Sequence, residues 1–217
     1  MVQRCSGVVW LICIFALLGT PCDGYAVRSV QFLANSAEPG EISAQETVEQ
    51  ARKLSTEGKL DEALHFYQQA FQEFQRDGAL SEQAAVMSDI AVLLRRMGDV
   101  KQSLALQQQA VELYTRLGDV SGKAKGLRRI GVLHRHNGNF EDAIAAQEEA
   151  LELLQQLDDQ DGIAMVLINL GTIYGDLGRL EEARTYFDRA LTIYIRLENQ
   201  QGVSYTYGNL GQLSLYL

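Results

Sequence analysis

Apolar residues recur along most of this chain at spacings of three and four, the period of one face of an α-helix. Leu167, Leu170 and Tyr174 form one such face. Gly178 follows, at the point where a helix usually ends in a left-handed residue. The segment 179–182 (Arg-Leu-Glu-Glu) then opens a second periodic stretch, with acidic residues near the positive helix terminus. The pattern predicts two helices joined by a glycine turn.

The second predicted helix alternates small and large residues. Its apolar positions are Ala183, Phe187, Ala190, Leu191 and Tyr194. Small residues at fixed points let two helices approach closely, and the larger side chains fill the space beside them. The pair of stretches is therefore expected to fold as a helix hairpin.

The same pattern returns every 40 residues without insertion or deletion. A Gly-x-x-x-x-Ala or Gly-x-x-x-x-Ser phrase starts at four positions, Gly58, Gly98, Gly138 and Gly178. A second set of glycines, which we place in the turn that follows each second helix, is Gly122, Gly162 and Gly202. A fixed period in this range indicates a solenoid, in which each unit buries its apolar face against its neighbours. We predict an all-α array of helix hairpins.

The residues of the fourth unit resemble a known family. The pattern Leu170-Gly171-x-x-Tyr174 followed by Ala183, Phe187 and Ala190 is similar to the tetratricopeptide repeat in its 40-residue form. The third unit keeps the glycine but has His134 and Gln147 where an aromatic residue is usual. The resemblance implies a right-handed α-solenoid with four full units and an unfinished fifth. The expected units are about 44–80, 81–120, 121–160, 161–200 and a partial 201–217.

The first residues do not belong to the repeat. Arg4 precedes an apolar run over 7–18, and small residues follow it. This order is typical of a secretory signal peptide over 1–24, cleaved after Gly24 or Ala26. The run is shorter than the roughly 20 residues of a spanning helix, which disfavours the alternative of a retained signal anchor. Residues 25–43 are interpreted as a linker, and we expect export to the periplasm or the medium, with membrane contact only through an uncleaved leader.

The sequence offers little for catalysis. All three cysteines, Cys5, Cys13 and Cys22, lie in the leader, so the processed chain would have no thiol nucleophile or ligand. No phosphate-binding loop or nucleophile elbow is present. His134 and His136 are two apart, so they point in nearly opposite directions on a helix and cannot share a metal ion. We predict a protein that is not an enzyme and needs no metal or cofactor.

Charge is unevenly distributed. The formal net charge of −9 argues against a nucleic-acid partner, which requires a basic footprint. From 121 to 140, however, there are five cations and no acid, whereas 141–162 contains eight acids and no cation. The expected first helix of the third unit is therefore basic, and the second is acidic.

The resemblance implies that the first helix of each unit lines a concave groove. It places six cations there: Arg95, Arg96, Lys125, Arg128, Arg129 and Arg135. The alternative is that these cations only balance acids on adjacent second helices. Lys125 and Arg129 resemble half of a carboxylate clamp, but Asp89 stands where the other half requires asparagine. Asn169 and Asn209, at equivalent positions, are expected to hydrogen-bond the main chain of a bound peptide.

These features predict a non-catalytic scaffold that binds a protein or peptide with acidic segments in the groove. A second hypothesis is the docking or sensor half of a larger effector enzyme, for example of the caspase-like CHAT type. The last predicted helix presents Leu210, Leu213 and Leu217 where another helix would pack. Exposed apolar patches usually indicate association, so we expect self-association at this edge or fraying from about Gly202.

The leader yields the first testable prediction. Because small residues follow the apolar run, the processed protein should begin near Tyr25 or Val27. Amino-terminal sequencing of the protein from an expressing host checks this. Recovery in the membrane fraction with Met1 or Gln3 at the amino terminus would instead establish an anchor.

Overall fold

The computed structural model describes residues 43–215 of the chain. Within this range it contains nine α-helices and no strand. In chain order the helices are α2 (Ala44–Thr56), α3 (Leu60–Arg76), α4 (Leu80–Arg96), α5 (Val100–Leu117), α6 (Val120–His136), α7 (Phe140–Gln156), α8 (Gln160–Asp176), α9 (Leu180–Arg196) and α10 (Gln200–Leu213). The predicted leader, nearly all of the predicted linker and Leu217 lie outside the described residues.

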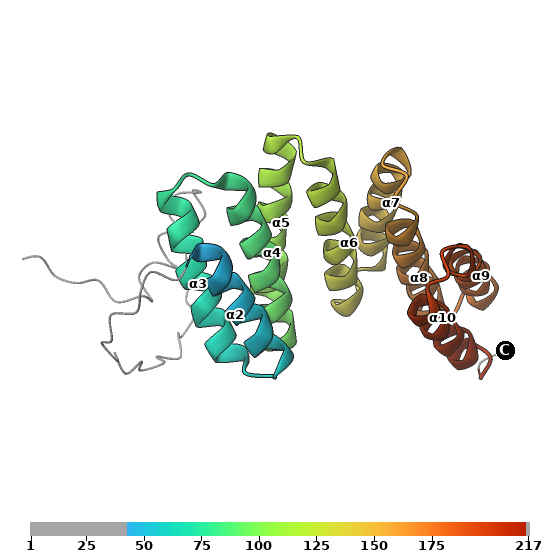
Figure 1. The fold of residues 1–217 in the computed structure, drawn as a ribbon. Helices are drawn as coiled ribbons and strands as arrows, with labels where there is room; N and C mark the ends of the chain where they lie inside the picture. Colours follow the sequence, from blue (N-terminus) through green and yellow to red (C-terminus); the bar gives the residue numbers. More distant parts are fainter. Residues whose placement is uncertain (1–42, 216–217) are drawn as a thin grey trace, which may run out of the picture. The chain divides into compact units, whose positions relative to one another are not determined.

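The helices pack in the order of the sequence (Figure 1). The hairpins are α2–α3, α4–α5, α6–α7 and α8–α9, and each second helix also packs against the first helix of the next unit. The last helix, α10, packs against α9 and touches α8. This packing between neighbours confirms the predicted all-α solenoid of helix hairpins.

Glycine ends the first helix of four units, as the repeat predicts. Gly58, Gly98, Gly138 and Gly178 have φ between +74° and +90°. At Gly178 the left-handed residue turns the chain so that the N–H of Arg179 donates to the carbonyl of Tyr174 at 2.9 Å. That bond satisfies one of the carbonyls left free at a helix end. A side chain at this position would be strained, which explains why glycine recurs there.

The second set of glycines was assigned to the wrong place. Gly122, Gly162 and Gly202 lie in the first turn of α6, α8 and α10, not in the loop before each helix. The positive φ of those three loops falls on Gly118, Asp158 and Glu198, and Gly78 has the same role before α4. At Gly162 the backbone N–H donates to Oδ1 of Asp159 at 2.9 Å, and an added Cβ would lie 2.7 Å from Leu154. These glycines therefore recur because the preceding second helix packs closely over them.

Close approach also explains the small residues inside each hairpin. Ala183 and Ala190, on α9, are fully buried. A Cβ atom added to Gly171 of α8 would lie 2.7 Å from the ring of Phe187. In the third unit Gln147 replaces the aromatic ring. Its Nε2 donates to the carbonyl of Arg128 at 2.8 Å, so this buried amide is hydrogen-bonded.

The carboxyl-terminal edge differs from the prediction. Leu213 is buried in the core cluster rather than exposed, because α10 folds back against α8 and brings Leu213 to 4.0 Å from the Cβ position of Gly175. Leu210 is half-buried. The large hydrophobic side chains exposed on α10 and just after it are instead Tyr205, Tyr207 and Leu215. Fewer leucines are therefore left uncovered than the pattern suggested.

Matched substitutions at two equivalent glycines test the role of close approach. Alanine at a helical glycine gains about 1 kcal/mol of helix propensity. Gly171→Ala should nevertheless destabilise the protein by about 1–3 kcal/mol, because its Cβ would overlap Phe187. Gly211→Ala should be neutral or stabilising, because nothing lies within 4 Å of its Cβ position. Urea midpoints of the two variants measure the difference, and equal midpoints would contradict this account of the packing.

Candidate functional site

The first helices lie on the inner side of the array. Successive first helices touch across units, at α4–α6, α6–α8 and α8–α10, whereas successive second helices make no contact of similar extent in the described part of the chain. An array whose first helices are closer together than its second helices curves toward the first helices. We call this inner side of α4, α6, α8 and α10 the groove face, and all eight predicted site residues belong to these four helices.

Two of the six candidate cations hold neighbouring first helices together. Arg96 on α4 donates through Nη1 to the carbonyl of Ser55 at 2.8 Å and to its Oγ at 2.6 Å. Arg135 on α6 pairs with Asp176 on α8 at 2.8 Å. The partners are 41 residues apart in both cases, so these contacts join consecutive units. Arg96 and Arg135 therefore already form contacts that join neighbouring units.

Asp89 belongs to the same set of contacts between units. Its Oδ2 accepts from Nη2 of Arg52 at 3.1 Å. The equivalent position in the third unit is Arg129, which is half-buried. Asp89 is therefore already paired with Arg52 of the first unit. No asparagine stands there to complete a carboxylate clamp with Lys125 and Arg129.

Three cations of α6 remain without a carboxylate partner. Within residues 43–215, no ion pair involves Lys125, Arg128 or Arg129, and the same holds for Arg95 on α4. The nearby Lys123 differs, because it pairs with Glu149 of the adjacent second helix at 2.7 Å. The alternative that the cations balance acids on second helices thus describes Lys123 but not its three neighbours.

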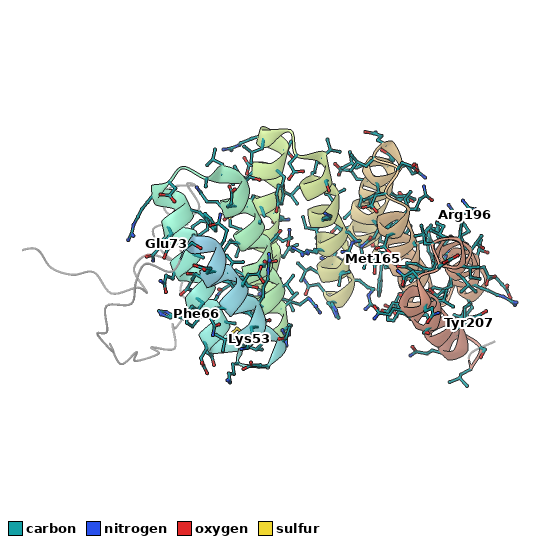
Figure 2. The ribbon with its side chains drawn as sticks, viewed as in Figure 1. Lys53, Phe66, Glu73, Met165, Arg196 and Tyr207 are labelled. Carbon is teal, nitrogen blue, oxygen red and sulfur yellow. The ribbon has the colours of Figure 1, made fainter. Side chains whose placement is uncertain are left out.

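Arg128 and Lys125 line a small cavity between α6 and α8. Its volume is about 80 Å³, and Met165 of α8 forms part of its wall (Figure 2). Asp159 and Asp161, from the start of the next unit, also line it. The cavity therefore combines two cations, an apolar thioether and two carboxylates that stand too far from the cations to form ion pairs.

The electrostatic environment disfavours the charge of Arg128. Burial, followed by the like charge of Arg129, lowers the pKa of the Arg128 guanidinium below its ordinary value. Asp161 and Asp159 act in the opposite direction but do not overcome these two effects. A guanidinium in this state would gain more from an additional anion than a fully solvated arginine would.

The two candidate asparagines have partners inside the protein. The side-chain amide of Asn169 on α8 donates to Oε1 of Gln147 on α7 at 3.3 Å, between consecutive units. The amide of Asn209 donates to the carbonyl of Tyr205 in its own helix at 3.1 Å. Asn169 is half-buried and its amide nitrogen is engaged. The contact of either residue with a bound peptide stays a prediction.

One register position shows how the groove face changes along the array. Lys125, Met165 and Tyr205 are separated by 40 residues and occupy equivalent sites on α6, α8 and α10. All three are exposed. The groove face therefore passes from a cation to a thioether to a phenol. Tyr205 was not among the predicted site residues, although its 40-residue spacing from Lys125 could have identified it.

Two histidines, His134 and His136, lie on α6 with four of the candidate cations. Nδ1 of His134 stands 3.8 Å from Oδ2 of Asp142, and His136 is exposed. Across the described segment, no group of three or more histidine, cysteine or acidic side chains is arranged to hold a metal ion. In the same segment no helix has the length and hydropathy needed to cross a bilayer.

A family model described as tetratricopeptide repeat matches four overlapping stretches, 47–116, 82–156, 122–196 and 162–217. Together they cover more than half of the chain. No sequence among the curated proteins matches this chain.

Solved structures resemble the fold at low sequence identity. BtubC (BKLC) from P. vanneervenii matches with a TM-score of 0.67 and 23% identity over 80% of this chain and 81% of its own. A Rap protein complexed with competence and sporulation factor matches with a TM-score of 0.68 and 19% identity over 80% of this chain. This chain spans 50% of that Rap protein.

A third match is a protein with several domains. It is a Signal Transduction ATPase with Numerous Domains from Pyrococcus horikoshii that carries a tetratricopeptide repeat sensor. The TM-score is 0.67 at 15% identity, over 75% of this chain and 25% of that protein. At these identities the likeness concerns the fold alone.

The unpaired guanidinium generates a stability prediction. Arg128→Met should stabilise the protein by roughly 0.5–1 kcal/mol, because it removes a half-buried charge that has no ion-pair partner among residues 43–215. The matched control is Arg135→Met, which loses the ion pair with Asp176 and should be neutral or destabilising by up to about 1 kcal/mol. Thermal and urea unfolding of both variants measure the difference. A loss of stability in Arg128→Met equal to that in the control would show that Arg128 is already well compensated.

Proposed function

This chain belongs to the tetratricopeptide repeat family, and from that premise we propose that it is a protein-interaction scaffold whose groove face binds an acidic segment of a partner protein. The repeat is a platform for binding rather than for chemistry, because the residues that recur every 40 positions are used to pack helices. The partner's carboxylates would lie against Lys125, Arg128 and Arg129, and its apolar side chains against Met165 and Tyr205.

One observation carries the proposal: α6 holds three cations on the groove face without an ion-pair partner in the described part of the chain. A cation left unpaired and partly desolvated costs stability, so its presence is easier to understand if an anion is bound during function. Charge-assisted hydrogen bonds from guanidinium to carboxylate are among the strongest polar contacts available to such a site.

The overall charge opposes an acidic partner at long range. The net charge of −9 repels it, while the groove cations attract it at short range. At about 0.15 M ionic strength the screening length is about 8 Å, so the repulsion is weakened at distance and the contact in the groove persists. Salt approaching molar concentrations should screen the contact as well and should raise the dissociation rate.

A selected peptide can test the groove. Random linear peptides displayed on phage would be selected on the immobilised protein, and the enriched sequences would be synthesised for binding measurements. We expect them to contain acidic and apolar residues. Arg128→Glu combined with Arg129→Glu should weaken their binding by at least about tenfold, because the groove would then repel carboxylates.

The matched control reverses two charges outside the groove. Lys101 and Arg184 are exposed on the second helices α5 and α9. Lys101→Glu with Arg184→Glu changes the net charge by the same amount and should leave affinity within about twofold. Circular dichroism would verify that both double variants stay helical. Equal affinity of the groove variant and the control would overturn the assignment of the site.

A second candidate function is the sensor part of a larger effector protein. The Pyrococcus horikoshii ATPase, in which a tetratricopeptide repeat sensor is one part of a longer chain, supports this candidate. The same groove would then recognise a signal and pass it to an attached domain. Sequencing the gene on both sides of the region that encodes this chain decides between the candidates, because a catalytic domain in frame would favour the sensor.

Export is part of the proposal because of the predicted leader over 1–24. The partner would then be another exported protein or a peptide in the same compartment. The proposed groove contacts do not depend on this location, so a retained leader would change where binding occurs but not the residues that bind.

A further inference from the structure

Side chains 41 residues apart meet where consecutive first helices approach each other. Nη1 of Arg96 on α4 donates to the carbonyl of Ser55 on α2 at 2.8 Å and to its Oγ at 2.6 Å. Arg135 on α6 pairs with Asp176 on α8 at 2.8 Å. The first pair joins the first and second units, and the other joins the third and fourth. In both pairs a guanidinium meets an oxygen.

The residues at the same positions between the second and third units are Arg95 and His136. They have the same separation along the chain, and their helices α4 and α6 are in contact. Here a guanidinium meets an imidazole, and neither side chain carries an oxygen. Within residues 43–215, no ion pair involves either of them. We call these two residues the Arg95–His136 pair.

The charge of Arg95 acts on His136. Partial loss of solvent around the ring, followed by the like charges of Arg135 and Arg95, lowers the pKa of the His136 imidazole below its ordinary value. Asp176 acts in the opposite direction but does not overcome these effects. The charged groups that shift this pKa come from α4, α6 and α8, and among the described residues none comes from α5 or α7. Protonation of the ring is therefore opposed by the arginine at the equivalent contact.

The pair can be reached by a segment that lies in the groove. His136 is exposed and Arg95 is half-buried. His136 follows Arg129 on α6 at a distance of about 10 Å along the axis, from a rise of about 1.5 Å per residue. An extended peptide advances about 3.3 Å per residue. Acidic side chains about three or four residues apart would therefore reach both places, with the half-buried Val132 between them.

We propose that the Arg95–His136 pair is a second anion-binding subsite of the groove, which takes a carboxylate of the partner's acidic segment. This inference rests on the proposed function and deepens it. The bound carboxylate supplies the oxygen that Ser55 and Asp176 supply at the two equivalent contacts. It also raises the pKa of the His136 imidazole, so binding takes up a proton from solvent. The partner is therefore held more tightly as the pH falls through the range in which His136 titrates.

Binding of rhodamine-labelled octa-aspartate, measured by fluorescence anisotropy at about pH 8 and about pH 5.5, tests the proposal. The aspartates stay ionised at both values, since their ordinary pKa is about 3.9. The affinity of the wild type should rise at least about threefold at the lower pH, because proton and carboxylate favour each other's binding. His136→Gln should remove this rise, whereas the matched control His65→Gln, on the second helix α3, should keep it. Proton NMR should show a higher pKa for His136 with the peptide than without it.

A carboxylate placed on α6 gives a second test. His136→Asp puts there the residue that Asp176 is on α8, so the new carboxylate should pair with Arg95 and raise the urea midpoint of the free protein. It should also weaken octa-aspartate binding at about pH 5.5 by at least about fivefold. The subsite is wrong if wild type and His136→Gln share one pH dependence, or if His136→Asp binds as tightly as the wild type. If Arg128→Glu with Arg129→Glu still abolishes binding in that case, the groove stands and only the subsite fails.

Absence of octa-aspartate binding at both pH values would overturn the subsite and the acidic groove together.

Discussion

The close approach of two helices at a small residue is the contact on which every unit of this protein depends. Phe187 can reach the backbone of α8 only because Gly171 has no side chain, and Ala183 and Ala190 allow α9 to follow it along its length. Burial of apolar surface stabilises the hairpin only when the two backbones come this near. The repeat of glycine and alanine every 40 residues is therefore a repeat of one packing contact.

Because this contact occupies one side of each first helix, the other side is free to vary. On α6 it carries Lys125, Arg128 and Arg129, and on α8 the equivalent positions carry Met165, Ile168 and Asn169. The fold tolerates a cation or a thioether at the exposed position of Lys125 and Met165, whereas Ile168 is 3% exposed and belongs to the core. Arg128 shows that the tolerance has a limit, because its charge is partly desolvated beside another cation. Sequence variation on this side can thus serve recognition at a modest cost in stability.

The same contact explains what is particular about α10. Its Gly211 and Tyr207 keep the register of a surface that elsewhere receives a helix, but the position over the glycine is open in the described segment. Leu213 is nonetheless buried, because α10 also packs sideways against the preceding unit. Packing within a hairpin and packing between units therefore use different faces of one helix. In the described segment, the hairpin face of α10 has no helix against it.

The sequence alone determined the helices, the left-handed glycines such as Gly178 and the hairpin repeat, because these follow from short-range geometry and from a period that is visible along the chain. It also singled out the cations of α6. The packing of the helices determines which candidate cations are engaged. Arg135 on α6 pairs with Asp176 and Arg96 on α4 donates to Ser55, whereas Arg128 has no carboxylate partner among residues 43–215. In the structure Gly162 lies in α8 and not in the loop that the sequence predicted, and Leu213 is buried and not exposed. These outcomes depend on the offset and distance between helices of consecutive units, which no local pattern of residues encodes.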